Sequence, residues 1–139
     1  RDGQLLLCVT LNDPDDWKDH AALFDYGFET YPRCLLASAG ETVGLVKTAG
    51  SLVPVVPVRT AGEVWYPLTA SEQVRAQLKL PESLQAPVGD DVPVGDLVFT
   101  LDGTVIGETP LVCDAGVHSD RAPKAGPLER LWSLFPWAG

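Results

Sequence analysis

Residues 97–113 read LVFTLDGTVIGETPLVC, in which Asp102-Gly103 separates two runs of apolar and β-branched residues. An Asp-Gly pair between two such runs is the strongest short-range signal for a β-hairpin, because the tight turn requires residues that accept positive φ. The stretch therefore predicts extended segments at residues 97–101 and 103–107, with a further run at residues 109–113.

Similar short runs fill the chain upstream of this hairpin. They lie at residues 34–37, 42–47, 52–60, 62–67, 74–80 and 84–87. The 13 Gly and 12 Pro are spread along the chain and do not form one low-complexity block. This punctuation favours many short strands over long helices. We therefore expect a mainly β fold, with a small β-sandwich-like domain at residues 33–117.

The first 32 residues have a different pattern. Residues 5–11 are almost continuously apolar, which predicts a strand buried on both faces. Turn and N-cap residues follow, and they predict a helix over residues 15–26 that stops at Gly27. We place a domain boundary after this unit, so that residues 1–32 form a strand-helix fragment.

The last part of the chain, residues 118–139, is expected to be a tether followed by a short amphipathic helix. The candidate surface or membrane contacts on this helix are Leu128, Leu131, Trp132, Phe135 and Trp137. These side chains suit a lipid interface, but Arg130 stands beside Glu129 and offers little attraction to anionic lipid. Anchoring to a membrane surface and docking onto a protein both remain open.

Composition and charge exclude several classes of protein. The chain has 139 residues, of which 45% are apolar, and no run is long enough to predict a membrane span. A formal net charge of −9 disfavours a nucleic-acid partner, since phosphate binding depends on clustered cations. The sequence after Arg1 has no signal-peptide pattern, so we expect the start to be internal to a longer protein.

No catalytic, cofactor-binding or metal-binding residue is predicted. The acidic residues before the helix are Asp13, Asp15, Asp16 and Asp19. They lack the Gly and closing Glu of a calcium loop, so we interpret them as a solvated helix start. Cys8, Cys34 and Cys113 have no Cys-x-x-Cys spacing, which argues against a zinc site or a disulfide framework. His20 and His118 lie on separate segments, so no Ser-His-Asp site is expected.

Trp65 and Tyr66 are the candidate ligand-stacking residues. They are adjacent and precede Pro67, in a predicted strand near a turn. An exposed aromatic pair of this kind can stack on a sugar or a peptide. Packing in the core or at a sheet edge is the alternative reading.

A family resemblance rests first on residues 1–17, RDGQLLLCVTLNDPDDW, and residues 24–28, FDYGF. They resemble the end of the catalytic domain of low-molecular-mass penicillin-binding proteins, the serine-type D-Ala-D-Ala carboxypeptidases. In that family a hairpin strand leads into a closing helix that ends in this pattern. Further short matches to the family's C-terminal β domain lie at residues 40–43, 86–88, 94–95 and 110–112.

The resemblance implies that residues 1–32 belong to an α/β catalytic domain and that residues 33–117 form the β domain behind it. The parent enzyme would remove the terminal D-Ala of peptidoglycan stem peptides in the extracytoplasmic space, through an acyl-serine intermediate. The expected partners are the parent's catalytic domain and, as further candidates, peptidoglycan, envelope proteins or the membrane surface. We also expect residues 5–11 to expose an apolar face and to pair with another copy or with the β domain.

The family's Ser-x-x-Lys, Ser-x-Asn and Lys-Thr-Gly elements do not occur in this sequence. The nearest likeness, residues 47–50, has one residue too many and is expected to form a turn. The chain is therefore predicted to be a noncatalytic C-terminal portion that positions the active site or docks partners. The alternative is an independent envelope domain that binds peptidoglycan or a protein.

Overall fold

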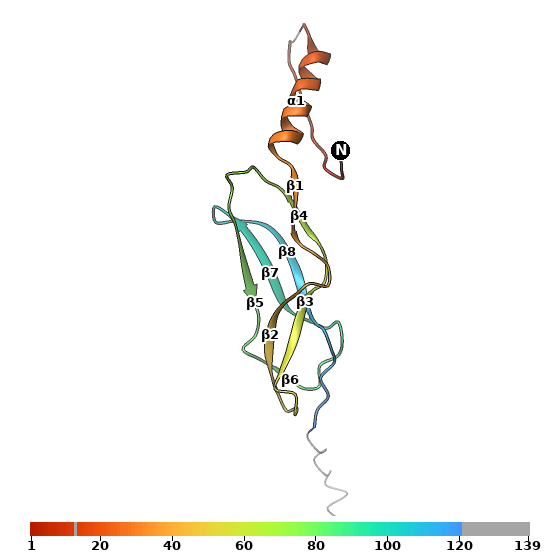
Figure 1. The fold of residues 1–139 in the computed structure, drawn as a ribbon, viewed down its shortest axis with the longest axis vertical. Helices are drawn as coiled ribbons and strands as arrows, with labels where there is room; N and C mark the ends of the chain where they lie inside the picture. Colours follow the sequence, from red (N-terminus) through yellow and green to blue (C-terminus); the bar gives the residue numbers. More distant parts are fainter. Residues whose placement is uncertain (13, 121–139) are drawn as a thin grey trace, which may run out of the picture.

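The computed structural model describes residues 1–12 and 14–120. Within them the chain forms one helix, α1 (Asp16–Thr30), at one end of an elongated molecule whose remainder is β structure (Figure 1). The strands are β1 (Arg33–Ala37), β2 (Thr42–Ala49), β3 (Val55–Thr60), β4 (Val64–Pro67), β5 (Val74–Lys79), β6 (Ser83–Gln85), β7 (Pro93–Leu101) and β8 (Thr104–Cys113). The last described residues, coloured blue after β8, lie at the end opposite α1.

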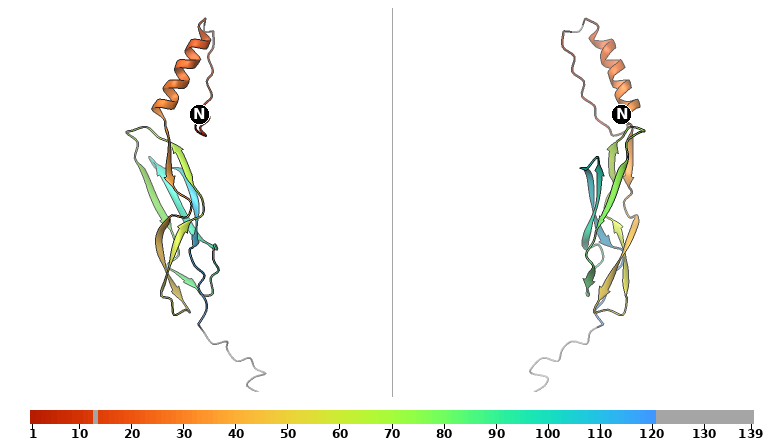
Figure 2. Two further views of the ribbon diagram at one scale, coloured as in Figure 1. Left: turned by 45° about the vertical axis from the view of Figure 1, so that its right-hand side comes forward. Right: turned by 90° about the vertical axis from the view of Figure 1, so that its left-hand side faces the viewer.

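The strands form two sheets. β1 pairs with β4 in an antiparallel two-stranded sheet, and the other six strands follow the order β5-β7-β8-β3-β2-β6. Neighbours in the larger sheet are antiparallel except β2 and β6, which run parallel. The larger sheet curls strongly, as Figure 2 shows from two further sides. This arrangement confirms the expected small, mainly β domain.

The central hairpin is the one that the Asp-Gly pair predicts. Asp102 and Gly103 have φ values of 49° and 83°, and Leu101 pairs with Thr104 directly across the turn. The runs predicted at residues 103–107 and 109–113 are a single strand, β8. The pairing of β7 with β8 shifts register between Phe99 and Thr100. The ladder continues on both sides of this shift, including past Gly107.

The main core lies between the two sheets. Ala37 and Val64 from the small sheet pack with Leu97, Phe99 and Leu111 from the large one, and all five are buried. Burying apolar side chains from facing layers is what stabilises a two-sheet domain. The predicted β-sandwich-like domain is therefore confirmed both by its strand content and by the packing of one sheet on the other.

A second core cluster closes the end of the domain that lies away from α1. It contains Val56, Cys113 and Val117, and the backbones of Val88 and Val117 form a bridge beside it. Because Val117 is buried there, the described chain stays attached to the domain beyond the last strand.

The strand predicted at residues 5–11 is wrong. The segment runs beside α1 without joining either sheet, so the expected pairing with the β domain is absent as well. A strand needs a neighbour that accepts its backbone hydrogen bonds, and the described residues supply none. The segment keeps the predicted exposed apolar face, since Leu5, Leu7, Val9 and Leu11 are 73% to 93% exposed.

The helix is longer than predicted. It continues through Gly27 to Thr30, and the predicted stop at Gly27 is wrong. A Cβ atom on Gly27 would stand 2.8 Å from Leu6 Cδ1, so the glycine allows the extended segment to approach the helix. The predicted strand at residues 52–60 is also too long, because β3 begins only at Val55.

Candidate functional site

The structure places Trp65 on the outer face of the small sheet. The residue is exposed, and its indole Nε1–H donates a hydrogen bond to a Glu63 carboxylate oxygen at 2.8 Å. The Arg33 guanidinium carbon lies 4.4 Å from the ring centre on the neighbouring strand β1, a cation–π contact. One face of the predicted stacking residue is therefore already covered by a side chain of the same protein.

Tyr66 does not share this face. Trp65 and Tyr66 are consecutive residues of β4, and consecutive side chains of a strand point to opposite sides. Trp65 is exposed while Tyr66 is partly buried. The two aromatic residues thus do not form one stacking platform, and Trp65 alone is available to a ligand on the outer face.

A hollow of about 300 Å³ adjoins Trp65 where the N-terminal segment meets the small sheet. Its lining residues are Arg1, Asp2, Gln4, Phe28, Pro32, Arg33 and Trp65. Arg33 donates a long hydrogen bond of 3.4 Å to the Asp2 carbonyl, and the Gln4 amide donates to the Tyr31 carbonyl at 2.9 Å. These contacts join residues far apart in sequence, and sequence reasoning gave no signal for Arg1 or Arg33.

The same end of the molecule carries an uncovered apolar surface. A second hollow, of about 360 Å³, lies between residues 6–9 and α1, with Leu23, Phe24, Gly27 and Tyr31 on its helical side. No residue of α1 is buried, and Trp17 at its start is 85% exposed. Thr10 and His20 share a hydrogen bond of 2.9 Å that holds the extended segment against the helix.

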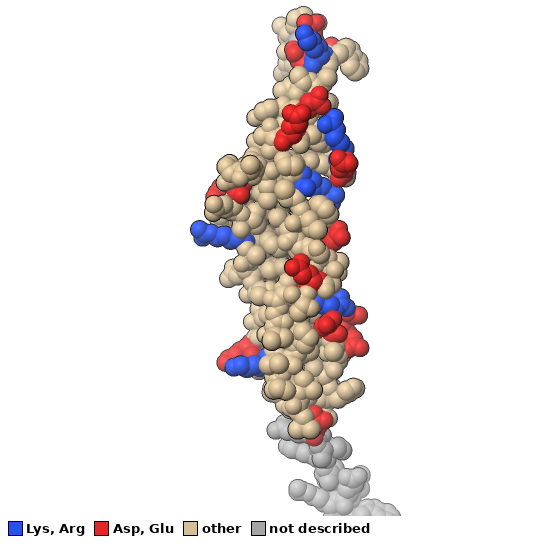
Figure 3. Space-filling model, in the orientation of Figure 1, with Lys and Arg blue, Asp and Glu red and all other residues tan. Residues whose placement is uncertain are grey.

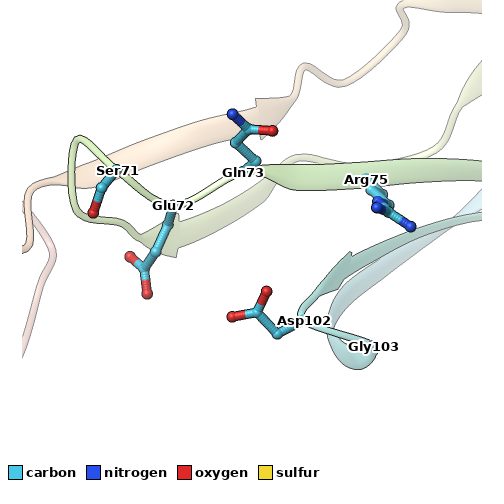
Figure 4. A pocket seen from close by; sticks show the side chains of 6 residues that line it. All are labelled: Ser71, Glu72, Gln73, Arg75, Asp102 and Gly103. Atoms are coloured by element: carbon cyan, nitrogen blue, oxygen red, sulfur yellow. The ribbon is translucent and has the colours of Figure 1, made fainter.

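A polar hollow of about 600 Å³ lies between the loop before β5 and the β7–β8 turn (Figure 4). The carboxylates of Glu72 and Asp102 face the same open space in this view. The Glu72 carboxylate accepts a hydrogen bond of 2.6 Å from the Thr69 backbone N–H, so it stabilises its own turn. We assign this group a structural role.

The titratable groups offer no metal centre within the described part of the chain. No group of three or more His, Cys, Asp or Glu side chains that could hold an ion occurs there. All three cysteines are free thiols, and Cys113 is buried. Burial, and secondarily the nearby Asp90 carboxylate, raise the pKa of the Cys113 thiol above its ordinary value.

The predicted contacts of the last helix, Leu128, Leu131, Trp132, Phe135 and Trp137, fall outside the described residues, as does Asp13. No helix over residues 1–12 and 14–120 is long and apolar enough to cross a membrane.

Sequence reasoning also missed two exposed residues, Leu52 and Val53. Their signal was an apolar pair between Gly50-Ser51 and Pro54, which we interpreted as the start of a strand.

The fold and these surfaces define a small β domain that follows a helical fragment with an open apolar face. The family model of the penicillin-binding protein 5 C-terminal domain matches residues 31–119. The chain belongs to this family. A search of curated protein sequences finds no match.

Solved structures share the fold. Penicillin-binding protein 5 from Haemophilus influenzae and the D-alanyl-D-alanine carboxypeptidase DacD from Francisella tularensis align with TM-scores of 0.62 and 0.53, each at 21% identity over 73% of this chain. A peptidoglycan synthesis regulatory factor from Streptococcus pneumoniae aligns with a TM-score of 0.58, at 14% identity over 77% of the chain. The alignments span only 30%, 26% and 34% of those three proteins.

Proposed function

We propose that this chain is the noncatalytic C-terminal portion of a D-alanyl-D-alanine carboxypeptidase that acts in peptidoglycan maturation outside the cytoplasm. In this proposal residues 1–32 complete the catalytic domain, residues 33–117 form the C-terminal β domain, and residues 118–139 form a tether and a contact helix. Family membership supports the assignment of the β domain. The resemblance of residues 1–28 to the end of the catalytic domain supports the assignment of the first segment.

The observation that carries the proposal is the uncovered apolar face at the N-terminal end. Leu5, Leu7, Val9 and Leu11 are exposed along one side of an extended segment, and no residue of α1 is buried. A 15-residue helix gains most of its stability from packing an apolar face, so a helix without buried residues calls for a partner. The extended segment likewise offers backbone groups to a neighbouring strand. In this proposal the catalytic domain packs on the helix and also pairs with the extended segment.

The shape of the molecule supports a spacer role for the β domain. α1 and the extended segment lie at one end, and the last described residues, coloured blue after β8, lie at the other (Figures 1 and 2). A catalytic domain on the first end would be held away from any surface that the C-terminal segment contacts. The proposed contact residues of that segment are Leu128, Leu131, Trp132, Phe135 and Trp137.

Hydrogen exchange tests the proposal. We compare this chain with the longer protein translated from the coding sequence upstream of Arg1, and follow the amides of residues 5–11 and of α1. We expect strong protection of both segments only in the longer protein, while β7 and β8 exchange equally slowly in both. Equal exchange of residues 5–11 in the two proteins, or an upstream sequence without the serine enzyme elements, contradicts the proposal.

The second candidate function is an independent envelope domain that binds peptidoglycan fragments or a protein. The exposed ring of Trp65 beside a hollow of about 300 Å³ is the observation in its favour. Titration with soluble peptidoglycan fragments tests it, using Trp65→Ala and, as the matched control, Trp17→Ala. Saturable binding that only Trp65→Ala abolishes supports this candidate, and binding unaffected by Trp65→Ala excludes the ring as the site.

A further inference from the structure

The connection between β2 and β3 presents two apolar side chains at its apex. Leu52 is 85% exposed and Val53 is 49% exposed, and we call this pair the distal tip. Leu45 on β2 and Val55 at the start of β3 extend the exposed apolar surface along the same hairpin. In Figure 1 the hairpin projects at the end of the molecule opposite α1. In the same view, Figure 3 shows uncharged surface at this end together with acidic side-chain atoms.

Both backbone N–H groups of the distal tip, and one of its two carbonyls, are hydrogen-bonded within the protein. The Leu52 N–H donates to an Asp120 carboxylate oxygen at 2.6 Å, and the Val53 N–H donates to Ser51 Oγ at 3.1 Å. The Val53 carbonyl accepts from Thr48 Oγ1, and the Pro54 carbonyl accepts from the Thr48 N–H at 3.0 Å. Side chains from three positions thus form hydrogen bonds with backbone groups that, in an exposed loop, are ordinarily hydrogen-bonded to water.

These hydrogen bonds lower the cost of moving the tip's backbone out of water. Moving an unsatisfied backbone group into a hydrocarbon environment costs several kcal/mol, roughly 2–7 by transfer measurements. The amides of Leu52 and Val53 and the Val53 carbonyl already have partners, so these three groups avoid most of that cost. The two side chains meanwhile gain by leaving water. The tip is also convex, since Leu52 projects almost fully, so it is suited to enter a soft surface and not to receive a ligand.

Asp120 fixes where the chain leaves the domain relative to the tip. Its carboxylate also accepts from Ser51 Oγ at 3.2 Å, and its N–H donates to the Gly50 carbonyl at 3.2 Å. Asp120, the last described residue, therefore lies directly beside the apex of the hairpin, and the sequence that carries the amphipathic pattern follows it.

We propose that the distal tip inserts into a lipid surface and is a membrane contact of the β domain itself, separate from the C-terminal segment. The exposed Lys47, which lies opposite Val55 in the β2–β3 pair, supplies a cation beside the inserted residues for lipid phosphates. The proposal goes beyond the role of a spacer and needs no catalytic domain. Its failure would leave the carboxypeptidase assignment untouched, and the reverse also holds.

Vesicle binding by the full chain tests the proposal. The vesicles are phosphatidylcholine with a minority of phosphatidylglycerol, and co-sedimentation gives the partition coefficient. We expect the double variant Leu52→Asp, Val53→Asp to lower it by about tenfold or more, since both side chains lose their favourable transfer from water. The matched control is Val105→Asp, at an exposed apolar residue of β8 near the opposite end, and should leave the coefficient unchanged.

Three results overturn the proposal. They are equal partitioning of the double variant and the unchanged chain, no measurable partitioning of the unchanged chain, and stronger partitioning of the double variant. Stronger partitioning of the double variant would show that the C-terminal segment docks on the tip and is released by the substitutions. Thermal unfolding of each variant verifies that the fold is retained, and both variants change exposed side chains only.

A second measurement locates the tip directly. In a Leu52→Trp variant, lipids brominated along the acyl chain should quench fluorescence beyond the quenching seen in the unchanged chain. A Val105→Trp variant is the control and should show no added quenching. Equal quenching in the two variants contradicts insertion of the tip.

Discussion

The Arg33 guanidinium carbon lies 4.4 Å from the centre of the Trp65 ring, and the same guanidinium reaches the Asp2 carbonyl at 3.4 Å. Arg33 therefore joins three parts of the chain: the N-terminal turn, the start of β1 and the outer face of β4. Gly3 adapts the turn to this contact, because a Cβ atom there would stand 2.6 Å from Arg33 Nη1. The contact is the point where the helical fragment is attached to the β domain.

Replacing Arg33 should loosen this attachment with a small loss of stability. We expect Arg33→Gln to lower the free energy of unfolding by about 0.5–1 kcal/mol, the value of an exposed cation–π contact. Arg33→Lys keeps the charge but not the planar stack, so its effect should be smaller. Urea unfolding followed by tryptophan fluorescence measures both. Unfolding curves that coincide for all three proteins would show that the contact contributes nothing.

Thr60 provides a buried hydroxyl that holds the turn between β1 and β2. Its Oγ1 accepts a hydrogen bond from the Glu41 N–H at 3.0 Å and donates to the Ser38 carbonyl, and the residue is fully buried. Thr60→Val removes the hydroxyl and leaves the Glu41 N–H and the Ser38 carbonyl without it, which should cost about 1–3 kcal/mol of folding free energy. Thr60→Ser retains the hydroxyl and should cost about 1 kcal/mol. Denaturant unfolding compares them, and a Thr60→Val variant as stable as the unchanged chain contradicts the assignment.

Gly95 allows β7 to pass close to the end of β5. An ideal Cβ atom there would lie 2.2 Å from the Lys79 carbonyl oxygen, a backbone atom that cannot move aside alone. We expect Gly95→Ala to destabilise the domain by about 1–3 kcal/mol through forced displacement of the strands. Gly62→Ala is the control, because its nearest neighbour lies at 3.7 Å, and it should change stability by about 0.5 kcal/mol or less. A shift in melting temperature measures both.

Cys113 should resist modification and should make stability fall at high pH. Burial raises the pKa of its thiol in the folded state, with a further contribution from Asp90. The unfolded thiol therefore ionises first as the pH rises through about 8.5, and stability is lost above that range. We expect an aromatic disulfide reagent to modify the partly exposed Cys8 and Cys34 and to reach Cys113 only on unfolding.

The matched variant for this pH dependence is Cys113→Ala. It removes the thiol, so its stability should fall less between about pH 7 and about pH 10 than that of the unchanged chain. Parallel stability curves for the two proteins over this range would show that the buried thiol is not responsible.

Local patterns of the sequence predict the β domain well. The Asp102-Gly103 turn needs only its own residues to adopt positive φ, and the hairpin forms where that dipeptide stands. By contrast, residues 5–11 have the composition of a buried strand but form none, because strand formation depends on a neighbour elsewhere in space. Gly27 looks like a helix stop, yet it serves the close approach of Leu6, a contact that no local pattern reveals.

The candidate surfaces were harder to predict than the fold. Trp65 was identified from its neighbours in sequence, but alternation along β4 separates it from Tyr66 and places it against Arg33 on another strand. In sequence, Leu52 and Val53 resemble the start of a strand. In the structure, Asp120, far along the chain, fixes the loop that exposes them. Both surfaces arise from contacts between distant residues, which periodicity and turn chemistry do not encode.

Labelling with a fluorescent penicillin, together with release of D-Ala from a D-Ala-D-Ala peptide, tests whether this chain itself carries the proposed enzyme's chemistry. The purified chain is incubated with each, and an intact D-alanyl-D-alanine carboxypeptidase is the positive control. We expect neither covalent labelling nor D-Ala release from this chain, since the proposed function places the acyl-serine chemistry in a catalytic domain outside it. Labelling of the chain, or turnover of the peptide, would place a serine nucleophile within these 139 residues and contradict its assignment as a noncatalytic portion.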